Sequence, residues 1–322
     1  MIGYSARLTS RCLRQLRTPD VVIASSPHPF VAVNGARIAL RHQAKFIFEV
    51  RDLWPLTLVE IGGHSSRHPL VRAMAWAERM GYERCDYTVS LMEGANDYMV
   101  TRGLGAGKFV HIPNGFDAQA FQEETEPLPV EHRSAVESLK NHGKRIILYS
   151  GHHGLANALG NVMGAARLLE DDQPVHFLLV GQGPEKERLQ MQAQQDQLGN
   201  VTFLPPVARA QMSALTRAVD VAYVGLQKKS LFKYGISPNK LFEYMAAALP
   251  VVFAVDTPHD EVVRAQCGSS VSAEDPAALA ALFRQIGQMP KAQLEEMGAR
   301  GRDYVQREHT YECLAQRYAC LF

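Results

Sequence analysis

The sequence lacks three features that would each point to a particular class of protein. It has no run of about eighteen apolar residues, so we expect no helix that spans a bilayer. Its five cysteines include no Cys-x-x-Cys pair and no metal-ligand spacing, which is typical of a chain in a reducing cytosol. Its formal net charge is only +1, which argues against general nucleic-acid binding.

The composition provides enough apolar residues for large cores. Hydrophobic residues make up 46% of the 322 residues and charged residues 21%, which is typical of a globular chain of roughly two domains. Basic residues are concentrated early, because residues 1–84 hold twelve Arg or Lys against six Asp or Glu. Such a face can attract anionic lipid headgroups, although a solvated surface is the simpler explanation.

The first seventeen residues, MIGYSARLTSRCLRQLR, spread four arginines through apolar positions. They contain no continuous apolar segment and no small-residue cleavage site, so we interpret them as a basic amphipathic helix and not as a secretory signal. This helix, and a second one that carries Arg67, Arg72, Trp76 and Arg79, could rest on a membrane surface or simply cover a globular domain.

Short β-rich runs alternate with helical patterns in two series, which predicts two domains that each contain a parallel sheet covered by helices. The first series runs from a strand at residues 20–25 to a strand at 109–112, and the second begins with a strand at 146–150. We place the first domain at residues 1–118, a linker with the next domain's first helix at 119–143, the second domain at 144–305 and a C-terminal helix at 306–322.

Glycine-rich turns follow two strands of the second series. GHHG (residues 151–154) comes after the first strand of that series, and GQGP (residues 181–184) comes after the next. In open α/β sheets, ligands bind outside the carboxyl ends of the strands. The two turns and the loop at residues 234–240 all fall on that edge, so we expect a binding site there.

The segment YGISPNKLFEYMAAALPVVF, residues 234–253, combines a loop, a helix start and a buried strand. Pro238 at the start of the helix leaves backbone N–H groups free to meet a phosphate. Lys240 adds a positive charge in the same turn, and Glu243 can accept hydrogen bonds from the vicinal hydroxyls of a ribose. The same pattern also describes an ordinary helix start followed by core residues. The segment therefore indicates a binding site only in combination with the other motifs of the chain.

Together, these motifs resemble those of retaining family-four glycosyltransferases, which have the GT-B fold, and in particular the WbuB-like branch of surface-polysaccharide glycosyltransferases. The motifs that carry the likeness are FEVRDLWP at residues 48–55, HIPNGFD at 111–117, YSGHHGLAN at 149–157, LVGQGP at 179–184 and the segment 234–253. The resemblance covers the chain from Asp20 onward. It implies two Rossmann-like domains that face each other across a cleft.

The resemblance implies that the second domain holds the donor, a nucleoside-diphosphate sugar with UDP as the expected nucleotide, and that no separate cofactor is needed. The turn at residues 151–154 would meet the diphosphate, Pro206 and Val207 the nucleobase, and Glu243 the ribose. The residues expected to bind the donor are Gly151, His152, His153, Gly154, Gly181, Gly183, Pro206, Val207, Gly235, Ile236, Ser237, Asn239, Lys240 and Glu243.

One position departs from the family pattern. Many members carry two glutamates separated by seven residues, and Gly235 stands where the first of them would be. The WbuB-like branch commonly has this Gly-Ile-Ser-Pro-Asn-Lys form. We therefore expect the sugar to be positioned by backbone amides of residues 235–237, and Lys240 to offset the charge of the departing diphosphate.

The first domain is expected to supply the acceptor side. The resemblance places Arg51 and Asp52 near the acceptor or the donor sugar, with an Arg51 salt bridge as the simpler alternative. His28 lies at the same edge and could touch the acceptor. Retaining enzymes of this fold show no obvious protein nucleophile, so we name Lys240, Asp52 and Arg51 as candidate catalytic residues. No Asp-x-Asp motif is present, so no catalytic divalent metal is expected.

The family's first domain normally begins with a strand and a glycine-rich loop before the position of Asp20, and this sequence has only a helical pattern there. We therefore expect an incomplete first domain, in which the strand at residues 20–25 has an unpaired edge. We interpret the chain as an N-terminally truncated or mis-started form of a longer enzyme. A coding extension upstream that restores the strand and the loop would support this interpretation.

The resulting hypothesis is a metal-independent, retaining transfer of an N-acetylated deoxyhexose or hexosamine from a nucleoside diphosphate to a lipid-linked saccharide, in O-antigen or capsule synthesis. Two alternatives remain open. One is a UDP-sugar 2-epimerase on the same fold, which needs no acceptor, and the other is a donor-binding chain without activity. We expect the protein in the cytoplasm or on the inner face of the cytoplasmic membrane.

Overall fold

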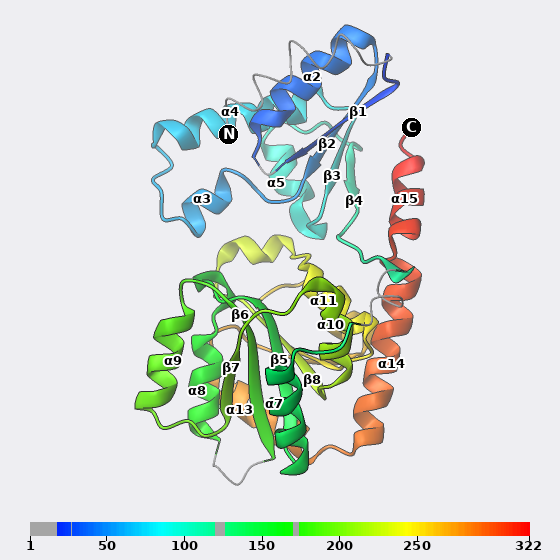
Figure 1. Cartoon of the computed structure of the whole chain (residues 1–322). Coiled ribbons are helices and arrows are strands. Elements are labelled where there is room, and N and C mark those ends of the chain that lie inside the picture. Colours follow the sequence, from blue (N-terminus) through cyan, green and yellow to red (C-terminus); the bar gives the residue numbers. More distant parts are fainter. Residues whose placement is uncertain (1–17, 27, 120–125, 170–173) are drawn as a thin grey trace.

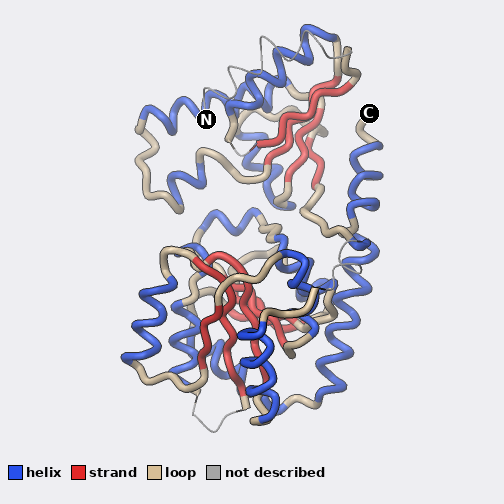
Figure 2. The backbone as a smooth tube through the Cα atoms, in the orientation of Figure 1, coloured by secondary structure: helices blue, strands red, loops and turns tan. Residues whose placement is uncertain are grey.

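The computed structural model describes residues 18–26, 28–119, 126–169 and 174–322 (Figure 1). The amphipathic helix expected at residues 1–17 and part of the expected linker lie outside these residues. The described chain forms two separate parallel sheets, and the paths of their strands are visible in Figure 2. The expected α/β class is therefore confirmed.

The first sheet contains β1 (Val21–Ser26), β2 (Lys45–Val50), β3 (Tyr87–Ser90) and β4 (Phe109–His111), in that order and all parallel. Within the described residues, β1 pairs only with β2, so its outer edge has no strand partner there. Ile23 in β1 is 46% exposed, whereas Phe46 and Phe48 in β2 are buried. Strand β1 therefore contributes one buried apolar residue, Ala24, to the core, whereas β2 contributes several.

Helices connect the strands of the first sheet. They are α2 (Phe30–His42), α3 (Leu56–Glu60), α4 (Pro69–Arg84), α5 (Asn96–Thr101) and the short 3-10 helix η2 (Glu93–Ala95). Helix α4 begins at Pro69 because proline suits the first helical position and the His68 ring accepts a hydrogen bond from the Leu70 N–H, at 3.2 Å. Arg67, which was expected on this helix, therefore lies just before it. Its buried face repeats at helical spacing, through Val71 and Met74.

The second sheet contains β5 (Arg145–His152), β6 (Val175–Gln182), β7 (Val201–Leu204), β8 (Val221–Gly225), β9 (Val251–Ala254) and β10 (Gly268–Val271). Its spatial order is β10-β9-β8-β5-β6-β7, and every neighbouring pair is parallel. Numbered from β5 as strand one and read from β7, this is the 3-2-1-4-5-6 order of the Rossmann fold. The order reverses between β5 and β8, so ligands are expected at the carboxyl ends of these two strands.

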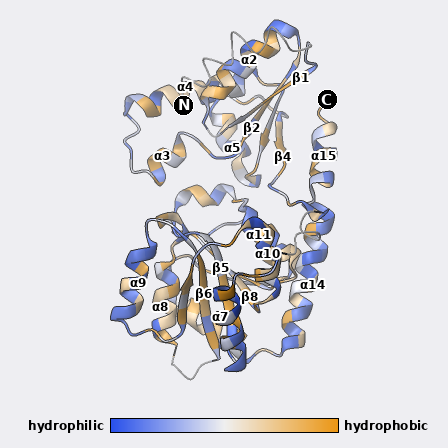
Figure 3. Ribbon diagram, viewed as in Figure 1, coloured by the Kyte–Doolittle hydropathy of each residue, from blue (hydrophilic) through white to orange (hydrophobic). Residues whose placement is uncertain are grey.

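The helices of the second domain cover both faces of this sheet. They are α7 (Val130–Asn141), α8 (Gly160–Leu168), α9 (Lys186–Gln195), α10 (Arg209–Arg217), α11 (Asn239–Ala246), α12 (Glu261–Ala265) and α13 (Pro276–Gln288), with the 3-10 helices η3 (Leu155–Asn157) and η4 (Ser230–Tyr234). Hydrophobic residues are concentrated along the strands, while many helices carry one hydrophilic and one hydrophobic side (Figure 3). In the core, the Phe283 ring of α13 lies 4.9 Å from the Phe177 ring, centroid to centroid.

The chain passes between the two domains twice. It leaves β4 through residues 112–118, and it returns after α14 (Lys291–Glu308), so that α15 (Tyr311–Ala319) lies beside the first domain (Figure 1). The two passages are bonded to each other, because the Phe116 N–H donates to the His309 carbonyl (3.0 Å) and the Tyr311 N–H to the Phe116 carbonyl (3.2 Å). The helix break therefore comes at His309, inside the C-terminal helix expected at residues 306–322.

Helix α15 packs against the first sheet through a small apolar cluster. Leu314 and Leu321 are buried there together with Ile47, Val89 and Ile112. Two polar contacts add to this packing. The Tyr318 hydroxyl donates to the Glu49 carboxylate, and the Lys45 ammonium donates to the Leu321 carbonyl. The last helix of the chain is thus part of the first domain's core.

Replacing Leu314 by Ala should lower the free energy of unfolding by about 2–5 kcal/mol, because a buried leucine leaves a cavity when it is truncated. Gln316→Ala on the exposed side of the same helix is the matched control, with an expected change within about 0.5 kcal/mol. Urea unfolding followed by circular dichroism measures both. Equal changes in the two variants would show that α15 does not depend on this cluster.

Candidate functional site

The carboxyl ends of β5 and β6 approach each other very closely. Gly151 pairs with Gly181, and both have positive φ values, of 139° and 149°. A Cβ atom on Gly181 would lie 1.9 Å from the Gly151 carbonyl oxygen, so only glycine fits there. Lys186 on α9 fastens the second turn, because its ammonium donates to the carbonyl oxygens of Gly181 (2.8 Å) and Leu204 (2.9 Å).

A pocket of about 290 Å³, which we call the turn pocket, lies at this edge of the sheet. Its lining comes from the ends of β5, β6 and β7. Five of the residues expected to bind the donor are part of it, namely Gly151, His152, Gly181, Pro206 and Val207. The fold thus brings the two glycine turns next to the loop expected to receive a nucleobase.

Lys240 reaches the same turn from α11. Its ammonium donates to the Tyr149 hydroxyl (3.0 Å) and lies 4.2 Å from the centroid of the Tyr149 ring, with the Asn157 side-chain oxygen at 3.5 Å. The Tyr149 hydroxyl in turn donates to the His152 carbonyl (2.7 Å). The ammonium is therefore held at a defined place beside the Gly151 turn, where a Cβ atom on Gly151 would lie 3.0 Å from it.

The surroundings of Lys240 also set its charge. Burial lowers the pKa of the Lys240 ammonium to about 8, while the nearby Glu243 carboxylate acts in the opposite direction. Lys240 is thus mostly charged near pH 7 and loses its charge as the pH rises above about 8. A ligand phosphate at this place would meet a cation that has already lost part of its hydration.

Helix α11 begins at Asn239, with Pro238 as the residue just before it, and no described side chain caps it. The N–H groups at its very start therefore remain available to a ligand. The helix is fixed to β5 by Tyr244, whose hydroxyl accepts from the Ser150 N–H (2.8 Å) and donates to the Ser150 carbonyl (3.3 Å). Glu243 is half-buried on this helix, and Asn239 is exposed.

His153 lies behind the turn. It is fully buried, and neither ring nitrogen has a well-placed hydrogen-bond partner among the described residues. Burial and the charges of Lys186 and Lys240 lower the pKa of His153 to about 4, against an opposing effect of the Val180 backbone, so the ring is neutral at pH 7. His152 is exposed. Of the two histidines, only His152 can therefore meet a ligand without a rearrangement.

A second pocket of about 260 Å³, the cleft pocket, lies between the domains. The first domain contributes Arg51 and Asp52 to it, and the second contributes Gly235, Ile236 and Ser237. Although the Asp52 side chain is exposed, partial desolvation in this cleft raises the pKa of its carboxyl, and Arg51 opposes that shift. The Arg51 side chain is exposed at this pocket, and within the described residues its charge acts on the adjacent Asp52 without forming a close ion pair.

The loop at residues 234–240 is held from the first domain's side. The Asn114 N–H donates to the Ser237 hydroxyl (2.8 Å), and the Asn114 side-chain amide donates to the Ser237 carbonyl. Gly235 has a φ of 101°, and a Cβ atom on it would lie 3.3 Å from the Glu93 backbone nitrogen. Both the backbone angle and the crowding favour glycine over a larger residue there.

An ionic cluster closes the cleft behind Gly235. The Glu93 carboxylate of η2 meets the Arg264 guanidinium (2.7 Å) and the His259 ring (3.4 Å), and Arg264 also contacts Glu261 (3.2 Å). Desolvation is the largest single effect and would raise the pKa of Glu93, but the bond to Arg264, the Arg264 charge and the nearby histidines together outweigh it, so the pKa is lowered. Carboxylate and guanidinium therefore remain charged and hold the two domains together.

Two further residues of the first domain, His28 and Glu49, line neither the turn pocket nor the cleft pocket. His28 is 5% exposed, and burial lowers its pKa. Glu49 accepts hydrogen bonds from the Ser25 hydroxyl (2.8 Å) and from Tyr318, so it secures α15. Within the described residues, no group of three or more His, Cys, Asp or Glu side chains is placed to hold a metal ion.

Tyr149, Asn157 and Lys186 all support the turns, although no sequence motif gave them a role. For Tyr149 a signal was present. Side chains alternate along a strand, so the residue two positions before Gly151 shares its face and points toward whatever lies beside that turn. The Lys186 ammonium donates to a backbone oxygen, and the Asn157 side-chain oxygen accepts from Lys240. No spacing in the sequence predicts such contacts.

Comparison with known proteins gives matches to both halves of the chain. The model of a family described as glycosyl transferases group 1 matches residues 131–304, and the model of a glycosyl transferase 4-like domain matches residues 1–115. The protein WcaI of Escherichia coli (strain K12), provisionally described as a colanic acid biosynthesis glycosyl transferase, is 27% identical over 284 residues. These residues are 85% of this chain and 67% of WcaI.

Solved structures match nearly the whole chain. Anabaena Alr3699/HepE in complex with UDP and glucose has a TM-score of 0.74 at 14% identity, covering 98% of this chain and 80% of that one. WaaG, a glycosyltransferase involved in lipopolysaccharide biosynthesis, has a TM-score of 0.64 at 14% identity, covering 95% and 86%. At such identities the likeness shows the fold alone, and it confirms the expected GT-B arrangement.

Replacing Tyr149 by Phe should lower the free energy of unfolding by about 1.5–3 kcal/mol, because the buried Lys240 ammonium loses a hydrogen-bond acceptor. The matched control is Tyr223→Phe. Tyr223 is also buried, but its hydroxyl has no well-placed hydrogen-bond partner among the described residues, so its removal should change stability by less than about 0.5 kcal/mol or increase it. Urea unfolding at pH 7 compares the two, and equal losses would contradict a supporting role for Tyr149.

Proposed function

The chain belongs to the glycosyl transferases group 1 family, and from this premise we propose that it transfers a sugar from UDP to a lipid-linked saccharide with retention, in the synthesis of a surface polysaccharide. The proposed sugar is an N-acetylated deoxyhexose or hexosamine. One observation carries the donor assignment most directly, namely the Lys240 ammonium held on Tyr149 beside the Gly151 turn. The name of WcaI supports the polysaccharide, and the HepE complex supports UDP.

The proposed donor spans the two pockets. The nucleobase would enter the turn pocket at Pro206 and Val207, the ribose would meet Glu243, and the diphosphate would lie between the Gly151 turn and Lys240. The sugar would extend into the cleft pocket against the backbone of residues 235–237. The first turn of α11 connects these places, because Pro238 lines the cleft pocket while Lys240 reaches the Gly151 turn.

In the proposed reaction, the bond between C1 of the sugar and the diphosphate oxygen breaks while the acceptor hydroxyl attacks C1 from the same face. The departing phosphate oxygen takes the proton of that hydroxyl, so no protein nucleophile is needed. Negative charge grows on the diphosphate as the bond breaks. Lys240 and the free N–H groups at the start of α11 are placed to stabilise it more strongly in the transition state than in the ground state.

Arg51 and Asp52 are the proposed contacts on the acceptor side. Both line the cleft pocket opposite the loop 235–237, from the other domain. A carboxylate accepts hydrogen bonds from sugar hydroxyls, and a guanidinium can donate to hydroxyls or to an acceptor phosphate. We assign them to orientation of the acceptor, which requires the domain contact between Asn114 and Ser237 to keep the two sides at a fixed distance.

A lipid-linked acceptor requires contact with a membrane, and helix α4 is the proposed contact. Leu70 and Trp76 on it are 41% and 58% exposed, and Arg72 is exposed beside them. Arginine next to exposed tryptophan suits an anionic headgroup layer. None of the described helices is long and apolar enough to cross a bilayer. We propose peripheral contact from the cytoplasmic side.

Lys240 gives the proposal a pH signature. The affinity for UDP should fall about tenfold between roughly pH 7 and roughly pH 9, because the ammonium with a pKa of about 8 loses its proton. Lys240→Ala should bind UDP about tenfold more weakly at pH 7 and show little pH dependence, and Lys240→Arg should keep its affinity at high pH. Isothermal titration calorimetry measures all three proteins.

Failure of the parent protein to bind UDP or UDP-sugars would remove the donor assignment. If UDP binds but its pH profile is the same in Lys240→Ala, the site exists and Lys240 is not part of it. Incubation with a UDP-sugar in the absence of acceptor separates the alternatives, because an epimerase forms a new UDP-sugar and an inactive chain forms no product.

Asp52→Asn should lower kcat for transfer at least about tenfold while the affinity for UDP stays within about twofold, since Asp52 lies on the acceptor side. Asp97→Asn, an exposed carboxylate in the same domain, is the control and should leave both values unchanged. A radiolabelled UDP-sugar with a synthetic polyprenyl-diphosphate monosaccharide measures transfer. Equal kcat values for Asp52→Asn and the parent would exclude Asp52 from the reaction.

A further inference from the structure

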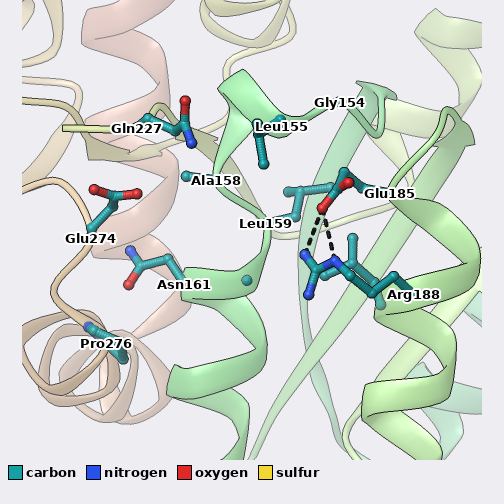
Figure 4. Close-up of a pocket in the computed structure, with 12 residues that line it drawn as sticks. Gly154, Leu155, Ala158, Leu159, Asn161, Glu185, Arg188, Gln227, Glu274 and Pro276 are labelled. Carbon is teal, nitrogen blue, oxygen red and sulfur yellow. Dashed lines mark hydrogen bonds and ion pairs between the residues drawn. The ribbon is translucent and has the colours of Figure 1, made fainter. Parts of the chain in front are cut away.

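A third pocket lies on the other side of the loop that follows β5. We call it the rear pocket. It has a volume of about 250 Å³ and is enclosed by the starts of α8, α9 and α13 (Figure 4). Since one water occupies about 30 Å³ of the liquid, this space is suited to a small molecule more than to a single water. This loop contributes to both places. The Asn157 side chain contacts Lys240, and the next residue, Ala158, lines the rear pocket.

The unusual feature of the rear pocket is Asn161. Asn161 is only 6% exposed, yet neither its amide nitrogen nor its amide oxygen has a well-placed hydrogen-bond partner among the described residues. Burial raises the pKa of the Tyr223 hydroxyl and the nearby Asn161 side chain opposes that shift, but the two groups do not meet with the geometry of a hydrogen bond. An unpaired buried amide costs about 1–3 kcal/mol, so a ligand that satisfies it would be favoured.

The other polar groups of the pocket define the chemistry of that ligand. Figure 4 shows the side chains of Asn161, Gln227 and Glu274 gathered on one side of the pocket, and the Glu185–Arg188 ion pair on the other. Arg188 is already neutralised by Glu185 at 2.7 Å, and Glu274 adds a carboxylate. An anionic ligand is therefore disfavoured.

Two amides and a carboxylate offer both donors and acceptors in a small space, and hydroxyl groups can serve as partners to both kinds. Leu155, which is 60% exposed, adds an apolar surface at the edge of the pocket. A neutral ring with several hydroxyls and an apolar face fits this combination, and the volume suits one ring.

We propose that the rear pocket is a second saccharide-binding site, which takes one uncharged sugar unit and is separate from the donor site. Asn161 is the residue that recognises the sugar, by donating to one hydroxyl and accepting from another. Gln227 and Glu274 bind further hydroxyls. This site does not depend on the proposed transfer reaction, because none of its residues lines the turn pocket or the cleft pocket. Gly154, at the end of the turn expected to meet the diphosphate, is the one lining residue that was also expected to bind the donor.

Saturation-transfer difference NMR on the full chain tests the site, with D-glucose, D-galactose and N-acetyl-D-glucosamine as probes. Excess UDP is present to compete for the donor site. At least one sugar should receive saturation from the protein, whereas cyclohexanol, a ring with a single hydroxyl, should receive much less. The signal should persist in Lys240→Ala, which separates this site from the donor site. Absence of a signal for all three sugars would overturn the proposal.

Asn161→Leu is the decisive variant. Leucine has a similar size and no polar atoms, and the amide it replaces has no partner, so the thermal midpoint should stay the same or rise. The affinity for the sugar should fall about tenfold or more. Gln227→Ala, at the side of the pocket, provides a second measurement and should weaken binding by a smaller factor. A sugar signal of unchanged strength in Asn161→Leu would show that the sugar binds elsewhere, and would also overturn the proposal.

Discussion

The close approach of the backbones at Gly151 and Gly181 is the constraint on which the rest of the site depends. Strands β5 and β6 can stay paired to their last residues because position 181 is a glycine, whose absent Cβ atom would otherwise strike the Gly151 carbonyl. That pairing buries His153, and Tyr149 is left with its hydroxyl pointing to the end of the strand, where it meets Lys240. The backbone geometry of the turns therefore decides which side chains can form the polar surface beside them.

The second constraint is the double passage of the chain between the domains. Phe116 and His309 are joined by a backbone hydrogen bond, and Asn114 bonds to Ser237 of the loop at residues 234–240. Across the cleft, Glu93 and Arg264 form a further link. Each contact is modest in energy, because surface ion pairs and single hydrogen bonds contribute about 1 kcal/mol. Together they fix the separation of the two walls of the cleft pocket, and the chemistry of a two-domain enzyme depends on that separation.

The structure gives a physical reason for Gly235, the residue that departs from the family motif. The sequence revealed the missing glutamate, but not what replaces it. In the folded chain, the Glu93 backbone and His259 lie against this residue, so a side chain at 235 would be crowded as well as strained. The carboxylate that lines the same pocket belongs to Asp52 of the other domain. Two residues so far apart in sequence could not have been paired from spacing alone.

The sequence by itself determined the two α/β domains, the approximate places of several strands and the edge where the motifs meet, because strand patterns, helical periodicity and glycine turns are local properties of the chain. The strands expected at residues 109–112 and 146–150, for example, are found as β4 (Phe109–His111) and β5 (Arg145–His152). Only the tertiary structure decided which of the motif residues can meet a ligand. His152 and His153 are adjacent in sequence, yet one is exposed and the other fully buried. Burial and the partners of Lys240, Asn161 and Glu49 depend on strands and helices brought together from distant parts of the chain, which no local pattern encodes.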